Sequence, residues 1–240
     1  MRLSDFKALT FDVYGTLIDW ESGMIAGLKP LTDQLPEPPS RDAILEAHAF
    51  HESSTQRANP SQDYRAILAV VYKRLAEEWG LPAPWEACLA YGNSVPNWPA
   101  FPDSAEALRY LAQHYKLVVL SNVDAVSFAA SQERLGLVFD AAYLAGDIGS
   151  YKPAARNFDY MLAALARMGI AKGDILHTAE SMFHDHAPAN DAGLANCWIY
   201  RRHAQEGFGA TMPPGEMPRY DFCFHSMADL AAAHRAEQAP

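Results

Sequence analysis

The chain has 240 residues, half of them hydrophobic and a fifth charged, and its formal net charge is −10. This length suits one large globular domain or a core with an insertion. The acidic balance disfavours nucleic acid and anionic membranes as partners, because there is no surplus of basic side chains to neutralise phosphates. No apolar run is long enough to span a membrane, and the three scattered cysteines fit the reducing cytoplasm.

The first predicted strand leads to an aspartate. Residues 8–13 are mostly apolar, which is typical of a buried parallel strand, and Gly15 permits a sharp turn directly afterwards. A carboxylate at the carboxyl end of a central strand lies in the crevice where open α/β sheets bind ligands. With one oxygen exposed, Asp12 can attack a substrate and form an ester intermediate. The alternative is that Asp12 only hydrogen-bonds the turn.

A region with few β-like segments follows the first strand. Residues 43–51 and 64–79 have the apolar spacing of helices, and prolines divide the rest of the region into short pieces. An insertion at this point of the chain stands over the carboxyl edge of the sheet. We therefore expect a helical cap domain, residues 19–96, that encloses the site at Asp12.

From residue 97 onward, predicted strands and helices alternate. In chain order they are helix 104–115, strand 117–120, helix 125–135, strand 141–145, helix 157–168, strand 174–178, strand 195–200, strand 222–224 and helix 227–234. An exposed loop is expected at 207–218. Strands separated by helices imply crossover connections. We therefore expect an α/β fold with a doubly wound, mainly parallel sheet, built from residues 1–18 and 97–240.

Short polar motifs lie at the ends of four predicted strands. They are Asp12-Val-Tyr-Gly-Thr-Leu, Leu120-Ser121-Asn122, Lys152-Pro153 and the segment 180–185. In these motifs, in their order and in the helical insertion after the first of them, the chain resembles the haloacid dehalogenase-like hydrolases. The L-2-haloacid dehalogenases are the group that it resembles most. The resemblance implies that Asp12 is the nucleophile.

The residue two positions after the nucleophile separates reaction types in this family. Phosphatases have a second aspartate there, which protonates the leaving oxygen, whereas this chain has Tyr14. A halide leaves without a proton, but losing acid–base assistance costs phosphate ester cleavage about 10²–10⁴-fold. The resemblance therefore implies hydrolytic dehalogenation of short 2-haloalkanoic acids to 2-hydroxyacids. A Mg²⁺-dependent phosphatase of a small phosphorylated metabolite is the alternative, and a non-catalytic binding protein is a third.

The resemblance also assigns roles to other residues of the motifs. Lys152 orients the Asp12 carboxylate and stabilises its charge, and a solvated surface lysine is the alternative. Ser121 and Asn122 bind the substrate carboxylate and the intermediate, or they form an ordinary helix cap. Thr16 donates to Asp12 or caps the first turn of a helix.

The fourth motif departs from that of the dehalogenases. Those enzymes have Ser-x-Asn ahead of the motif's aspartate, whereas this chain has Glu180 and Met182 and retains Asp185. Glu180 and Asp185 resemble the acidic pair that holds Mg²⁺ in the phosphatases, and the metal ligands would then be Asp12, Tyr14, Glu180 and Asp185. We favour a site without a cofactor, in which Asp185 or Glu180 activates the water that hydrolyses the ester.

The cap arginine that grips substrate carboxylate and halide in the dehalogenases has no clear counterpart. Candidates on or near the predicted cap helices are His48, His51 and Arg65, and a solvated helix face is the alternative for each of them. We expect a small anionic substrate as the partner. By the resemblance, we also expect a homodimer.

Overall fold

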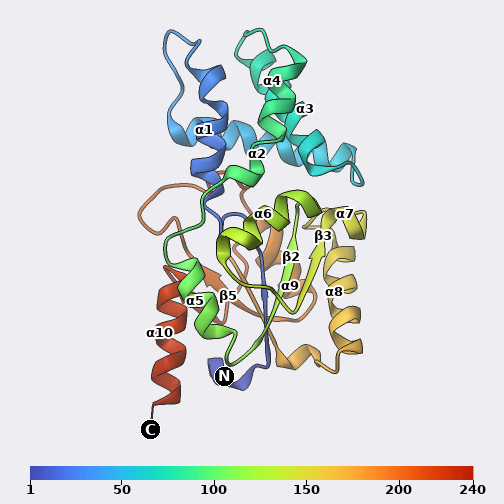
Figure 1. Cartoon of the computed structure of the whole chain (residues 1–240), viewed down its shortest axis with the longest axis vertical. Helices are drawn as coiled ribbons and strands as arrows, with labels where there is room; N and C mark the ends of the chain where they lie inside the picture. Colours follow the sequence, from blue (N-terminus) through green and yellow to red (C-terminus); the bar gives the residue numbers. More distant parts are fainter. Residues whose placement is uncertain (240) are drawn as a thin grey trace.

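A parallel sheet of six strands forms one end of the computed structural model (Figure 1). The strands are β1 Ala8–Phe11, β2 Lys116–Ser121, β3 Ala141–Leu144, β4 Ile175–Ala179, β5 Ala195–Ile199 and β6 Phe222–Phe224. Their spatial order is β3-β2-β1-β4-β5-β6, and neighbouring strands run parallel. The chain turns from one half of the sheet to the other at β1, so the carboxyl end of β1 is a topological switch point.

Helices cover both faces of this sheet. They are α5 Ser104–Leu111, α6 Ala125–Leu135, α8 Ala155–Arg167, α9 Ala187–Asp191 and α10 Met227–Gln238. Successive residues of β1 point to opposite faces. Ala8 belongs to the hydrophobic cluster that includes Phe158 of α8, whereas Leu9 belongs to the cluster that includes Leu108 of α5. The predicted α/β fold with a doubly wound, parallel sheet is confirmed.

The predicted core elements match the observed ones to within a few residues. The predicted helix 125–135 is α6, which begins after Asp124 and ends at Gly136, whose φ of 69° is left-handed. The segment 207–218 contains no helix or strand, but the prediction that it is exposed is wrong in part. Ala210 is buried, because this segment folds back so that the Ala210 N–H donates to Glu21 of the first helix.

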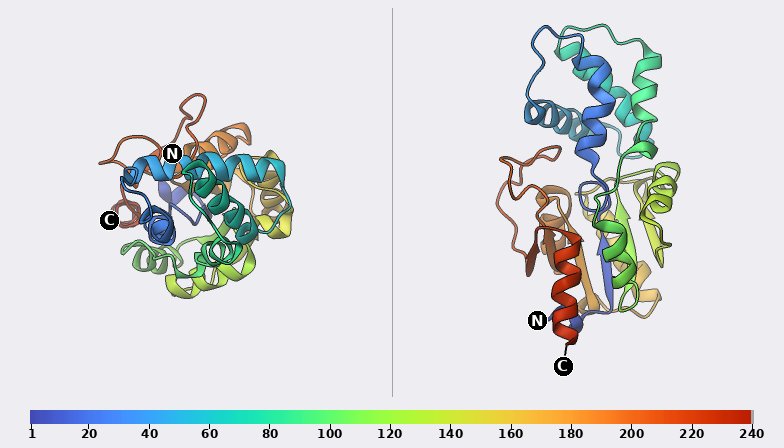
Figure 2. Two further views of the ribbon diagram at one scale, coloured as in Figure 1. Left: turned by 90° about the horizontal axis from the view of Figure 1, so that it is seen from above. Right: turned by 60° about the vertical axis from the view of Figure 1, so that its left-hand side comes forward.

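Four helices between β1 and α5 form a second layer, called here the helical insert (residues 20–92). They are α1 Trp20–Thr32, α2 Arg41–Ala58, α3 Tyr64–Glu78 and α4 Trp85–Gly92. The insert lies over the carboxyl ends of the strands (Figures 1 and 2). It falls within the region 19–96 for which the sequence predicts a helical cap.

Helix α1 was not among the predicted helices, since Gly23, Gly27 and Pro30 are normally helix breakers. The two glycines instead permit close packing within the insert. A Cβ on Gly23 would lie 2.3 Å from the Trp98 ring, and one on Gly27 would lie 2.9 Å from the Tyr91 ring. The absence of side chains at these positions therefore lets α1 pack against the aromatic residues that follow it.

The structure describes residues 1–239. Pro240, the last residue of the predicted core range 97–240, lies outside the described part. Among the helices of residues 1–239, none has both the length and the apolar character that crossing a bilayer requires.

Candidate functional site

Asp12 lies at the carboxyl end of β1, below the helical insert. Its backbone N–H donates to the carbonyl of Thr178 at 3.2 Å, which holds Asp12 against β4 at the switch point. The Thr16 hydroxyl donates to Oδ2 of Asp12 at 2.8 Å. Between them, Gly15 has a φ of 98°, which L side chains rarely adopt. The loop after β1 therefore positions one carboxylate oxygen by itself.

A buried lysine binds the other oxygen of Asp12. The Lys152 ammonium, with its side chain 2% exposed, donates to three oxygens. These are Asp12 Oδ1 at 2.9 Å, Asp185 Oδ1 at 2.6 Å and the Leu120 carbonyl at 3.0 Å. Asn122 fixes the backbone of Lys152 by two hydrogen bonds, one donated to its carbonyl at 3.0 Å and one accepted from its N–H at 2.6 Å.

Asp185 lies in the π-helical turn η4 (Met182–His186) and has a second partner besides Lys152. His177 Nε2 lies 2.9 Å from Asp185 Oδ1, and its Nδ1 lies 2.9 Å from the Thr10 hydroxyl. Burial raises the pKa of the Asp185 carboxyl, but Lys152 and His177 outweigh it and hold this pKa well below its usual range. Asp185 Oδ2 has no hydrogen-bond partner among the described residues.

The pKa of Asp12 shifts in the opposite direction. Burial raises it, the Lys152 ammonium opposes this rise, and the negative charge of Asp185 adds to it. The two carboxylates share one cation, and only Asp185 has His177 as well. Asp12 is therefore the more basic carboxylate of the pair, which favours it as the nucleophile.

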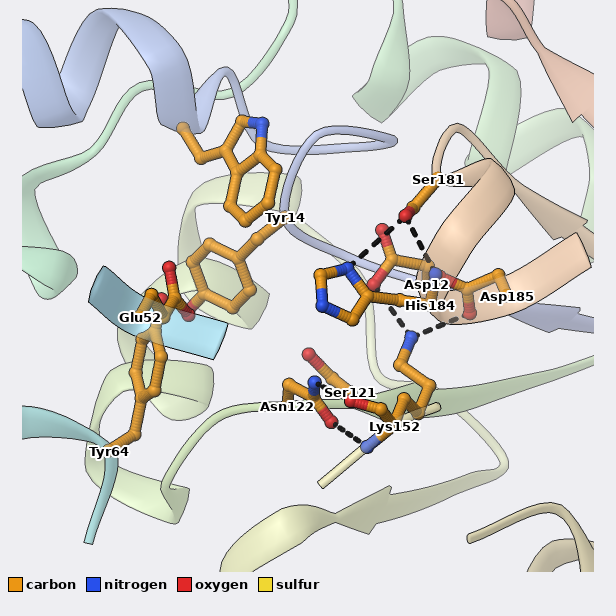
Figure 3. Close-up of a pocket in the computed structure, with 11 residues that line it drawn as sticks. Asp12, Tyr14, Glu52, Tyr64, Ser121, Asn122, Lys152, Ser181, His184 and Asp185 are labelled. Atoms are coloured by element: carbon orange, nitrogen blue, oxygen red, sulfur yellow. Dashed lines mark hydrogen bonds and ion pairs between the residues drawn. The ribbon is translucent and has the colours of Figure 1, made fainter. Parts of the chain in front are cut away.

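A small cavity of about 20 Å³ lies over Asp12, with room for roughly one water molecule. It is lined by Asp12, Tyr14, Trp20, Glu52, Tyr64, Ser121, Asn122, Lys152, Ser181, His184 and Asp185. Figure 3 shows the residues of the core on one side and Glu52 and Tyr64 of the insert, together with Tyr14, on the other. The Ser121 hydroxyl is buried with no partner among the described residues, so it is free to donate to a ligand.

A family model for haloacid dehalogenase-like hydrolases matches residues 6–179. The chain belongs to this family. A search of curated protein sequences found no match. Among solved structures, the L-2-haloacid dehalogenase of Xanthobacter autotrophicus with chloropropionic acid covalently bound is 19% identical, with a TM-score of 0.77 and coverage of 96% of this chain and 98% of that one.

Two other solved structures cover 98% of this hydrolase. The defluorinating L-2-haloacid dehalogenase Rha0230 is 19% identical over 99% of its own length, with a TM-score of 0.77. The putative hydrolase YfnB from Bacillus subtilis, bound to magnesium, is 17% identical over its full length, with a TM-score of 0.74. At these identities the likeness extends to the fold.

Glu180 of this hydrolase lies next to the site but faces away from its cavity. Its N–H donates to the Thr16 hydroxyl at 2.9 Å, so its backbone supports the residue that holds Asp12. Glu180 is among the residues that line a separate cavity of about 240 Å³, together with Arg41, Arg201 and Arg202. The structure therefore does not place this carboxyl where it would activate water at Asp12.

The predicted metal ligands do not surround a common point in this structure. The Lys152 ammonium lies between the Asp12 and Asp185 carboxylates, and the Glu180 carboxyl belongs to the other cavity. Within residues 1–239, no group of three or more His, Cys, Asp or Glu side chains has an arrangement that fits a metal ion. The Asp12 and Asp185 carboxylates thus contact the Lys152 ammonium, and Glu180 does not line their cavity.

Three predicted cap residues also lie outside the cavity. His48 is fully buried within the insert, where its Nε2 lies 2.7 Å from the Tyr91 hydroxyl. His51 pairs with Glu78 at 2.5 Å. Arg65 Nε lies 3.5 Å from Oδ1 of both Asp63 and Asp124 and so links the insert to the start of α6. His48 and His51 therefore contact residues of the insert, and Arg65 pairs with Asp63 and Asp124.

Glu52 is one of the cavity residues that the sequence does not single out. It lies one helical turn after His48, and the buried face of α2 runs through Leu45, His48, Ala49, Glu52 and Gln56. A carboxyl at a position of this stripe that normally holds an apolar side chain is the signal that identifies it. Tyr14, which stands where the phosphatases have their second aspartate, contributes a wall of the cavity, and its hydroxyl lies 2.8 Å from Ser131 Oγ.

The position of Glu180 leads to a prediction about stability. Burial, assisted by the charges of Glu21 and Asp12, raises the pKa of Glu180 from 4.5 to about 8. Because this pKa is higher in the folded than in the unfolded state, the contribution of Glu180 to the free energy of unfolding is most favourable below pH 4.5. This contribution is lost as pH rises through about 8. We expect Glu180→Gln to reduce this loss, measured by denaturant unfolding at pH 5 and pH 9. Glu133→Gln, at an exposed position of α6, is the control, and equal effects of both substitutions would contradict the assignment.

Proposed function

We propose that this hydrolase converts short 2-haloalkanoic acids to 2-hydroxyacids through an ester on Asp12. The observation that supports it is the environment of Asp12. Thr16 and Lys152 hold its two oxygens in a cavity that has a tyrosine, and no second carboxyl, at residue 14. Such a site supplies an aimed carboxylate nucleophile, and halide is a leaving group that departs without being protonated.

In the first step, an oxygen of Asp12 attacks the carbon that carries the halogen. The carbon–oxygen bond forms as the carbon–halogen bond breaks, and the halide leaves with the bonding electrons. An in-line displacement of this kind inverts the configuration of the carbon. Acids with short chains need the least widening of this cavity, which has room for roughly one water molecule.

The substrate carboxylate is assigned to the core side of the cavity. The free hydroxyl of Ser121 is the donor available there, because the Asp124 carboxylate already accepts from the Val126 and Ser127 N–H groups that begin α6. The Lys152 ammonium adds positive charge. The proposal includes a small anionic substrate and no metal cofactor.

In the second step, water attacks the carbonyl carbon of the Asp12 ester. Asp185 is among the residues that line the cavity, its Oδ2 has no partner among the described residues, and it is assigned to orient this water. Lys152 stabilises the negative charge that develops on the ester oxygen. The hydroxyacid leaves with one proton of the water on its new hydroxyl, the other proton passes to solvent, and the Asp12 carboxylate is restored.

A panel assay tests this proposal. We expect halide release from chloroacetate, bromoacetate, fluoroacetate and 2-chloropropionate, with equal rates in EDTA and in Mg²⁺. Hydrolysis of p-nitrophenyl phosphate serves as the comparison reaction. Phosphate release that depends on Mg²⁺, together with no halide release, would overturn the proposal in favour of a phosphatase.

A further inference from the structure

Glu52 is a buried carboxyl on the insert side of the cavity over Asp12 (Figure 3). The amide of Gln56 donates to its Oε1 at 2.8 Å, and His48 Nδ1 lies 3.4 Å from its Oε2. No lysine or arginine among the described residues forms an ion pair with it. The insert therefore brings into the active cavity a further carboxyl to which the dehalogenation proposed above assigns no role.

The geometry of displacement gives this acid a place in the reaction. In an in-line attack the leaving group departs on the side of the carbon opposite the attacking oxygen. Asp12 lies on the core side of the cavity, and Tyr14, Glu52 and Tyr64 form the other side (Figure 3). A group that leaves a carbon bonded to Asp12 therefore departs toward this opposite wall.

The surroundings of Glu52 favour its protonated form. Burial raises its pKa to about 7, although hydrogen bonds from Tyr64 and Gln56 oppose the rise. The titratable groups that face it are His48 on α2, Tyr64 on α3, Tyr91 on α4, Tyr14 and Tyr151 of the core, and Asp12, Lys152, His184 and Asp185 across the cavity. His48 is uncharged at neutral pH because burial lowers its pKa to about 3. Glu52 thus carries an O–H group mainly below about pH 7.

We propose that Glu52 donates a hydrogen bond to the departing halide and that this contact selects fluoride as a leaving group. The inference rests on the proposed function. As the bond from Asp12 to carbon forms, the carbon–fluorine bond breaks, and fluoride leaves with the electron pair while the proton stays on Glu52. Fluoride is the smallest halide and the strongest hydrogen-bond acceptor among them, so it gains most from a donor placed on this wall. Bromide departs readily without this assistance.

Two substitutions at this position separate the donor from the rest of the wall. Glu52→Met removes the donor, and we expect it to lower fluoride release from fluoroacetate by about 10²-fold while bromide release from bromoacetate changes by less than about 3-fold. Glu52→Gln keeps an N–H donor that does not titrate in this range. Glu46→Met, at an exposed position of the same helix, is the matched control and should leave both rates unchanged.

The pH profile gives a readout that a structural role would not change. The donor exists only below the pKa of Glu52, so fluoride release by the wild-type enzyme should fall as pH rises above about 7. Bromide release should not show this fall. In Glu52→Gln, fluoride release should no longer decrease above this pH.

The role of Glu52 would be overturned if Glu52→Met lowered the release of fluoride and of bromide by the same factor. It would also be overturned if fluoride release had the same pH profile in wild type and Glu52→Gln. Either result would leave the proposed function intact. If Glu52→Met does not fold, the profile of Glu52→Gln decides. No halide release from any acid by the wild-type enzyme would overturn both.

Discussion

Replacement of Asp12 by asparagine is expected to lower halide release by on the order of 10⁴-fold or more. The amide has nearly the shape of the carboxylate, so Thr16 and Lys152 remain in place, but a neutral amide is a very weak nucleophile. The rate of halide release under saturating substrate, measured with an electrode or a colorimetric assay, checks this expectation. Asp159→Asn, at an exposed position of α8, is the matched control and should be fully active.

Isotope labelling tests the covalent step of the same prediction. In water enriched in heavy oxygen and with enzyme in excess, water attacks the ester at the Asp12 carbonyl carbon. The label should therefore appear in the peptide that contains Asp12, and the hydroxyacid of the first turnover should carry unlabelled oxygen. Label in that first product, or full activity of Asp12→Asn, would contradict a nucleophilic Asp12.

The convergence of the core residues can be predicted from the sequence because it follows from topology. Asp12 follows β1 and Ser121 ends β2, and Lys152 comes after β3. In a parallel sheet all of these carboxyl ends lie on one edge, so residues far apart in the chain converge there. Alternating apolar segments are sufficient to predict the strands, and the strand order then brings these side chains together.

The direction of individual side chains cannot be predicted in the same way. Spacing suggests that Glu180 and Asp185 face one point, but the turn between them is π-helical and is capped by Ser181, which accepts from the His184 N–H at 3.0 Å. That local geometry turns Asp185 toward Lys152 and leaves Glu180 facing the other cavity. Hydrophobic periodicity contains no information about such a turn.

The contacts of the insert are harder to predict, because they are made by glycines inside a helix and by a buried carboxyl. Gly23 and Gly27 lie inside a helix because aromatic rings occupy the space that their side chains would need. Glu52 occupies a buried position that periodicity assigns to apolar residues. Both observations depend on what packs against α1 and α2, which the sequence of either helix does not reveal by itself.

Replacement of Lys152 by methionine is expected to lower both stability and activity. It leaves Asp12 and Asp185 buried beside each other without a cation, and breaking a buried ion pair in this way costs about 3–5 kcal/mol. Without the ammonium, burial and mutual repulsion raise the pKa of one carboxyl. A raised pKa means that the loss of stability is largest at high pH and is relieved as pH falls. Denaturant unfolding at pH 5 and pH 8 measures this difference.

The double variant Lys152→Met with Asp185→Asn identifies the cause of the loss. Asparagine removes one of the two unpaired charges, so the double variant should be more stable than the sum of the two single effects implies, yet equally inactive. Additive losses would contradict a shared ion pair. Lys116→Met is the matched control, because Lys116 pairs with Asp140 at 2.7 Å while its side chain is 60% exposed. An exposed pair contributes about 0–1 kcal/mol, so the difference between the two lysines separates the effect of burial from that of ion pairing itself.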